Sequence, residues 1–109
     1  MARVTTFPVL SDLHGPYLTE ITRILRQALQ GTRSRVYLFG SRATGQHRVA
    51  SDFDIAVESS DEVRRLLGMA REMLEGSNIP FTVDLVDLKA TSEVLRRRVL
   101  EQGILLWSN

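Results

Sequence analysis

Two aspartates two residues apart, Asp52 and Asp54, stand in the stretch "SDFDIAVE", whose alternation predicts a β-strand with one covered face. Residues two apart on a strand share a face, so the two carboxylates lie together while Phe53, Ile55 and Val57 point to the opposite, helix-covered side. Carboxylates this close repel each other unless water, a proton or a cation intervenes. Oxygen ligands of this kind suit Mg²⁺ or Mn²⁺, which bind through one or two carboxylates plus substrate phosphates.

A later predicted strand, "FTVDLVDL", supplies a candidate third carboxylate. Asp84 lies in mid-strand, whereas Asp87 has the opposite parity and lies at the strand end. If this strand neighbours the strand of the first two aspartates, three carboxylates converge. Asp84 is therefore favoured over Asp87 as the third member.

The pair Gly40-Ser41 ends the apolar run "RVYLFGS", one loop before the aspartates. A small residue at a strand end lets backbone amides, and often a following helix N-terminus, approach a phosphate closely. Two divalent ions held by a carboxylate cluster can stabilise both the attacking and the leaving oxygen in a displacement at phosphorus. A phosphate cradle beside a magnesium site predicts phosphoryl-group chemistry on a nucleotide.

Seven helices and strands are expected to position these residues. Apolar residues three and four apart, with capping residues and glycine stops, predict helices from Pro16 to about Gly31, from Ser60 (as N-cap, with Asp61 and Glu62 in the first turn) to Gly76, and from about Ser92 to Gln102. Strands are expected at 35–41, 51–58, 81–88 and 104–107. Apart from these seven elements, the N-terminal arm offers a short strand at 7–10. This order predicts an α/β (α+β) fold, a mixed sheet with helices packed on it, as a single domain over 16–109 after an irregular arm over 1–15.

The composition bounds the function classes. With 109 residues, 43% hydrophobic and 25% charged, the chain should form one folded domain. A net charge of +1 provides no large basic field, so no direct nucleic-acid partner is expected. The absence of cysteine excludes a disulfide framework and a thiolate metal site. No segment approaches the roughly 20 apolar residues of a membrane span, so no membrane partner and a cytoplasmic location are expected.

The chain resembles the DNA polymerase β-like nucleotidyltransferase superfamily in three stretches, "FGSRATG", "RVASDFDIAV" and "VDLVDL". Within that superfamily it is similar to the minimal nucleotidyltransferases (MNT), antitoxins that are paired with HEPN-domain toxins. The resemblance covers Pro16 to Trp107 in element order. It departs from the usual Gly-Ser-Arg-Ala-Arg-Gly at Thr44, which stands in place of an arginine and puts one triphosphate contact in doubt.

The resemblance implies a polymerase β-like fold and a set of residue roles. Gly40 and Ser41 would hold the β- and γ-phosphates of ATP. Asp52 and Asp54 would bridge two Mg²⁺ ions, and Asp84 would ligate the metal that activates an acceptor hydroxyl. That hydroxyl attacks the α-phosphorus and pyrophosphate leaves. Further matches to nucleotide-binding positions of the family are Arg42, Arg48 and Ser51.

The resemblance also implies a partner. In MNT–HEPN pairs the acceptor is a tyrosine near the toxin's RNase site, so transfer of AMP silences the toxin, and a hetero-oligomer with a HEPN toxin is expected. One alternative is an inert antitoxin of the same fold that neutralises the toxin by binding alone. Another is a small-molecule nucleotidyltransferase whose acceptor domain is a separate chain.

Three other features have an ordinary structural explanation. His47 lies in the loop before the aspartates, where a solvated histidine is favoured over a phosphate or metal ligand. The arginines at 96–98 spread over different faces of a helix, which favours a solvated helix over a docking site. Trp107 is expected to pack at the end of the sheet, and an interface anchor is the alternative.

Overall fold

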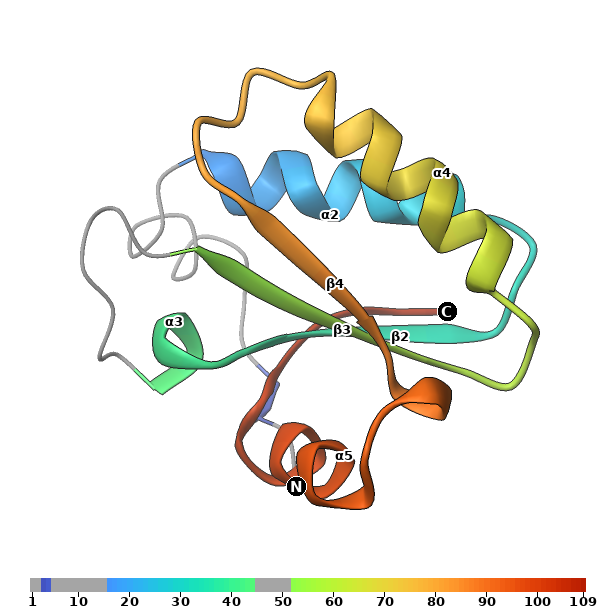
Figure 1. The fold of residues 1–109 in the computed structure, drawn as a ribbon, viewed down its shortest axis with the longest axis vertical. Coiled ribbons are helices and arrows are strands. Elements are labelled where there is room, and N and C mark those ends of the chain that lie inside the picture. Colours follow the sequence, from blue (N-terminus) through green and yellow to red (C-terminus); the bar gives the residue numbers. More distant parts are fainter. Residues whose placement is uncertain (1–2, 5–15, 45–51) are drawn as a thin grey trace.

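A mixed β-sheet forms the centre of the molecule. The structure, a computed structural model, describes residues 3–4, 16–44 and 52–109. The sheet has five strands in the order β1-β5-β2-β3-β4 (Figure 1). The strands are β1 (Arg3–Val4), β2 (Ser34–Phe39), β3 (Phe53–Ser59), β4 (Val83–Asp87) and β5 (Ile104–Ser108). β2 is antiparallel to both β3 and β5, whereas β4 pairs with β3, and β1 with β5, in parallel. The predicted fold class is confirmed.

Helices cover both faces of this sheet. α2 (Tyr17–Ala28) and α4 (Arg64–Glu75) lie on one face, and α5 (Glu93–Gln102) lies on the other (Figure 1). A one-turn helix, α3 (Ser41–Thr44), follows β2, and a 3₁₀ turn, η1 (Leu88–Ala90), follows β4. Among the described residues, no helix is long and apolar enough to cross a membrane.

The alternation of β3 places residues in two separate hydrophobic clusters. Phe53, Ile55 and Val57 are fully buried in the larger cluster, together with residues of α2 and α4. Ala56 points the other way and is fully buried in a smaller cluster that includes Val99 of α5. The expectation of one covered face is therefore wrong, because η1 and α5 cover the second face as well.

All seven expected helices and strands are present, with boundaries shifted by a few residues. The helix expected from about Ser92 begins there: Ser92 is the N-cap of α5, and its Oγ accepts a hydrogen bond from the Leu95 amide at 3.2 Å. The sequence did not predict α3, η1 or the two-residue strand β1, which pairs with β5. The strand expected at 7–10 lies outside the described residues.

The start of α4 differs from the expectation. The helix begins at Arg64, after Val63, and no side chain caps it from the N-cap position, so Ser60 is not its N-cap. Glu62 instead accepts from the Arg64 amide through Oε1 at 2.9 Å. Asp61 accepts from the Arg33 amide through Oδ2 at 2.8 Å, which ties it to the loop before β2 rather than to the helix.

Candidate active site

Asp54 and Asp84 lie directly opposite each other on the parallel strands β3 and β4. The strand adjacency on which the expected convergence depends is thus present. Asp52 directly precedes β3 and is exposed, as is Asp84, whereas Asp54 is half-buried. Neighbouring strands are about 4.8 Å apart, so the two in-register carboxylates occupy one local surface.

The pKa of Asp54 is raised above its usual value. Burial is the first cause, followed by the negative charges of Asp84 and then Asp52. Both neighbours therefore lie close enough to disfavour the ionised form of Asp54. A cation placed among the three side chains would offset this repulsion.

Gly40 lies against the same carboxylate. It follows Phe39, which pairs in register with Asp54, and it adopts a positive φ of 71°. A Cβ at Gly40 would overlap with Oδ2 of Asp54 and lie 3.2 Å from its Cγ. Glycine at this position lets the end of β2 pass the carboxylate closely and turn into α3, where the Ala43 amide donates to the Gly40 carbonyl at 3.1 Å. Gly40 therefore lies directly beside the half-buried carboxylate of the three.

Arg42 lies on the inner side of this site. Its side chain is 5% exposed, and its Cζ lies 3.9 Å from the centroid of the Phe53 ring and 5.3 Å from that of Phe81. Burial lowers the pKa of Arg42, while the charge of Asp52 opposes this shift. The guanidinium therefore fastens α3 to β3 from within the protein, and its expected nucleotide contact stays a prediction.

An aromatic layer supports the strand that bears the aspartates. Phe81 makes edge-to-face contacts with Phe53, at 5.9 Å between ring centroids, and with Tyr17, at 5.3 Å. Sequence reasoning did not identify this layer or the stacked Arg42. The sequence does contain a signal for the aromatic layer, namely Phe53. This aromatic residue stands between Asp52 and Asp54 in the chain, so its ring points to the opposite face of the strand from their carboxylates.

Other candidates fall outside the cluster. Asp87 accepts from the Lys89 amide through Oδ1 at 3.0 Å and caps η1, which is a local structural role. Arg48, Ser51 and His47 lie outside the described residues. Their expected roles are neither supported nor opposed by the structure.

The donor set fits a hard divalent cation that shares its ligands with substrate. Among the described residues there is no ready-made group of three or more histidine, cysteine or acidic ligands. Mg²⁺ commonly binds through one or two carboxylates and completes its shell with phosphate oxygens and water. Asp54 and Asp84, which pair in register on β3 and β4, supply that smaller number.

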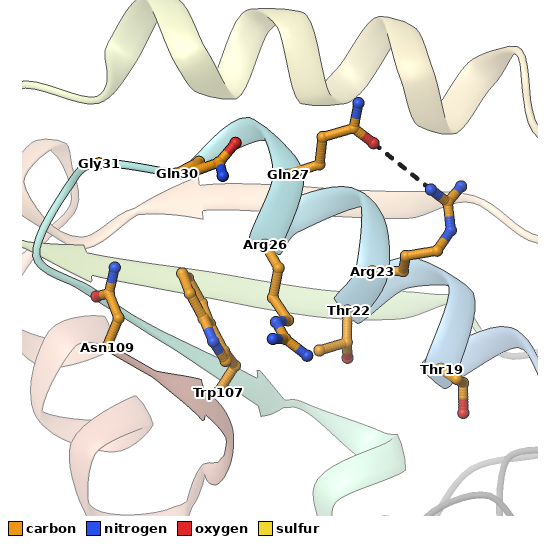
Figure 2. Close-up of a pocket in the computed structure, with 9 residues that line it drawn as sticks. All are labelled: Thr19, Thr22, Arg23, Arg26, Gln27, Gln30, Gly31, Trp107 and Asn109. Atoms are coloured by element: carbon orange, nitrogen blue, oxygen red, sulfur yellow. Dashed lines mark hydrogen bonds between the residues drawn. The ribbon is translucent and has the colours of Figure 1, made fainter.

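Asp84 also lines a cavity of about 600 Å³ on the β4 side of the molecule. Arg71 of α4 borders this cavity, and its Nη2 donates to the Leu85 carbonyl at 3.0 Å. A larger cavity, of about 710 Å³, lies along α2 and is lined by none of the site residues (Figure 2). Of the three aspartates, Asp84 is the one that borders this open space.

Comparison with known proteins identifies the family. The model of the family described as "Polymerase beta, Nucleotidyltransferase" matches residues 20–109. The chain is 39% identical over 72 residues to the protein adenylyltransferase MntA of Shewanella oneidensis, covering 66% of this chain and 52% of that protein. It is 33% identical over 94 residues to a probable protein adenylyltransferase MntA of Haemophilus influenzae, covering 85% of this chain and 80% of that protein. The match thus spans about half the length of the first relative.

Two solved structures have the same fold. A crystal structure of a toxin-antitoxin complex with AMP-PNP matches with a TM-score of 0.70 at 33% identity, covering 84% of this chain and 73% of that one. A complex of a tri-AMPylated Shewanella oneidensis HEPN toxin with an MNT antitoxin matches with a TM-score of 0.55 at 31% identity, covering 84% and 70%. The chain therefore belongs to the polymerase β nucleotidyltransferase family, and within it is similar to the MntA protein adenylyltransferases.

Proposed function

We propose that the chain is an antitoxin that transfers AMP from ATP to a tyrosine hydroxyl of a HEPN-domain toxin and thereby neutralises it. The observation that carries the proposal is the in-register pair Asp54 and Asp84 beside Gly40, whose missing side chain leaves room for the Asp54 carboxylate. The names of the similar proteins support the same reaction: adenylyltransferases, an AMP-PNP complex and an AMPylated toxin.

The proposed step is a displacement at the α-phosphorus of ATP. The tyrosine oxygen forms a bond to the α-phosphorus, and the bond from that phosphorus to the oxygen bridging to the β-phosphate breaks. AMP becomes esterified to the toxin, pyrophosphate leaves, and the hydroxyl proton passes to water beside the exposed Asp84. Backbone amides at Gly40 and Ser41 would bind the β- and γ-phosphates, with Arg42, Arg48 and Ser51 as further proposed nucleotide contacts.

The three aspartates would hold two Mg²⁺ ions, with Asp52 and Asp54 shared between them and Asp84 on the acceptor side. Bound ions would supply positive charge to the attacking and leaving oxygens, which the chain's own carboxylates cannot do. The raised pKa of Asp54 supports this assignment, because a cation would relieve the repulsion that Asp84 and Asp52 impose.

A second candidate function is an antitoxin that neutralises its toxin by occlusion alone. It is favoured by one observation, that Thr44 stands where the family has an arginine, which would remove a contact to the triphosphate. The two candidates share a fold and a partner and differ only in whether chemistry occurs.

Label transfer separates these candidates. The purified chain is incubated with Mg²⁺ and the HEPN protein encoded beside its gene, with ATP labelled at either the α- or the γ-phosphate. Adenylyl transfer predicts label on the HEPN protein from the α-position only, with loss of label on adding EDTA or in Asp54→Asn. Retained neutralisation by Asp54→Asn without any label would establish the occlusion function instead.

A further inference from the structure

One face of α2 carries a continuous polar stripe. Its exposed members recur at intervals of three and four, so they share one side of the helix, away from the buried apolar side. They are Thr19, Arg23, Arg26 and Gln27. Two further residues border them: Thr22, which is buried and donates to the Leu18 carbonyl at 2.9 Å, and Gln30, just beyond the end of α2. Together with Trp107 of β5 and Asn109 they line the cavity of about 710 Å³, which we name the α2–β5 groove (Figure 2).

The groove carries uncompensated positive charge. None of the described residues that line it is acidic. Arg23 is neutralised by Glu20, one turn earlier, through a contact of 2.6 Å between Nη2 and Oε1. The Arg26 side chain, by contrast, has no ion pair or hydrogen bond within the described part of the chain. A guanidinium that is exposed and unpaired attracts a carboxylate from outside the molecule.

Trp107 provides an apolar wall opposite this charge. Its ring is half-buried and packs against the larger hydrophobic cluster. Figure 2 shows Arg26 leaving α2 on the side where Trp107 and Asn109 lie. Tryptophan and arginine are both enriched among the residues that contribute most to binding in protein interfaces.

We propose that the α2–β5 groove is the docking surface for an acidic segment of the protein that receives AMP. The proposal rests on the proposed function, which requires a protein acceptor. On α2 the polar stripe runs from Thr19 to Gln27, which corresponds to about 12 Å, or just over two helical turns. A partner helix of that length would place a carboxylate against Arg26 and an apolar side chain against Trp107. Recognition of the partner would then lie outside the carboxylate site.

The charge of the groove favours a protein segment over a nucleic acid. Binding of a phosphate backbone requires several cations placed along the strand. Among the residues that the structure describes, the groove offers one guanidinium without an ion pair, and the whole chain has a net charge of +1. One carboxylate and one apolar contact match what the groove presents.

The test uses the fact that Trp107 is the only tryptophan of the chain. The protein is labelled with 5-fluorotryptophan, so a single ¹⁹F signal reports on the groove, and it is titrated without ATP with the HEPN protein encoded beside its gene. The signal should shift on binding. Arg26→Glu should weaken the affinity for the HEPN protein about tenfold or more. Added salt should reduce the difference in affinity between this variant and the wild type, because salt screens charge interactions. Arg65→Glu, a charge reversal on the exposed side of α4, should bind like wild type.

The outcomes separate this proposal from the proposed function. An unmoved ¹⁹F signal, or equal affinities for Arg26→Glu and Arg65→Glu, would overturn the docking surface even if AMP transfer occurs. A groove-dependent complex without any AMP transfer would overturn the enzymatic function and leave the docking surface standing. A single-stranded RNA that shifts the signal in the wild type, but not in Arg26→Glu, would reassign the groove to nucleic acid.

Discussion

Gly40 has a positive φ and lies close to the carboxylate of Asp54. The substitution Gly40→Ala, which adds a single methyl group, tests both features. We expect Gly40→Ala to lose about 1–2 kcal/mol of stability from its positive φ. The added Cβ must also displace the Asp54 carboxylate, so affinity for Mg²⁺-ATP should fall about tenfold or more, a loss of about 1.4 kcal/mol. Urea unfolding measures the first effect and calorimetric titration with Mg²⁺-ATP measures the second.

Gly31 provides the matched control. It also has a positive φ, of 86°, but a Cβ there would meet no atom within 4 Å. Gly31→Ala should therefore show a similar loss of stability with unchanged affinity for Mg²⁺-ATP. Equal ATP affinities for the two variants would show that the approach of Gly40 to Asp54 has no part in nucleotide binding.

Asp54 should make the stability of the chain depend on pH. Because its pKa in the folded state is raised, the unfolded state loses this proton first as the pH rises past the usual value of 3.8. The free energy of unfolding therefore falls as the pH rises from 3.8 to the pKa of Asp54 in the folded state, and the loss is constant above that pKa. Asp54→Asn removes the ionisable group, so it should be more stable than wild type at neutral pH and similar below pH 3.8.

Urea unfolding across this pH range measures the difference between the two proteins. Glu72→Gln, which removes an exposed carboxylate on α4, serves as the control and should follow the wild-type profile. Mg²⁺ should raise the stability of the wild type at neutral pH more than that of Asp54→Asn. A pH-independent difference between wild type and Asp54→Asn would contradict the repulsion among the three carboxylates.

At the scale of elements, the sequence predicted what local periodicity determines. Strand and helix repeats determine which face each residue takes, including Asp52, Asp54 and Asp84 on their strands and the apolar stripes of the helices. The helices, the strands and the candidate carboxylates could therefore be predicted from the sequence. The covered second face of β3 was not, because Ala56 is buried by η1 and α5, which come 30 or more residues later in the chain. The stacking of Arg42 on Phe53 was missed for the same reason, since only tertiary packing brings the two together.

Helix capping gives a direct test at this scale. Ser92→Ala should cost about 1 kcal/mol, because the Ser92 hydroxyl accepts from the Leu95 amide at the start of α5. Ser60→Ala should stay within about 0.5 kcal/mol of wild type, because α4 begins at Arg64 and Ser60 is an exposed position before it. Urea unfolding measures the loss in free energy of unfolding for each of the two variants. A larger loss for Ser60→Ala would mean that the helix starts where the sequence pattern suggested.

For the whole molecule, the two faces of the sheet are unequally covered. The face under α2 and α4 holds the larger hydrophobic cluster, to which α2 contributes Leu18, Ile21, Ile24 and Leu25. Among the described residues, the cluster under α5 and η1 has four buried members in all, and Val99 is the one contributed by α5. Burial of apolar area contributes about 25 cal/mol per Å², so the α5 side is held by a much smaller free energy.

This asymmetry predicts that α5 opens without global unfolding. Backbone amides of α5 should exchange with deuterium at a lower opening free energy than those of α2, since local stability follows the apolar contacts that an opening breaks. Val99→Ala should accelerate exchange in α5 by more than in α2, because it removes the side chain that fixes this helix to Tyr37 and Ala56. Hydrogen exchange measured by mass spectrometry resolves the two helices. Equal acceleration of exchange in α5 and α2 would show that the sheet and its helices unfold as one cooperative unit. The smaller hydrophobic cluster would then hold α5 as firmly as the larger cluster holds α2.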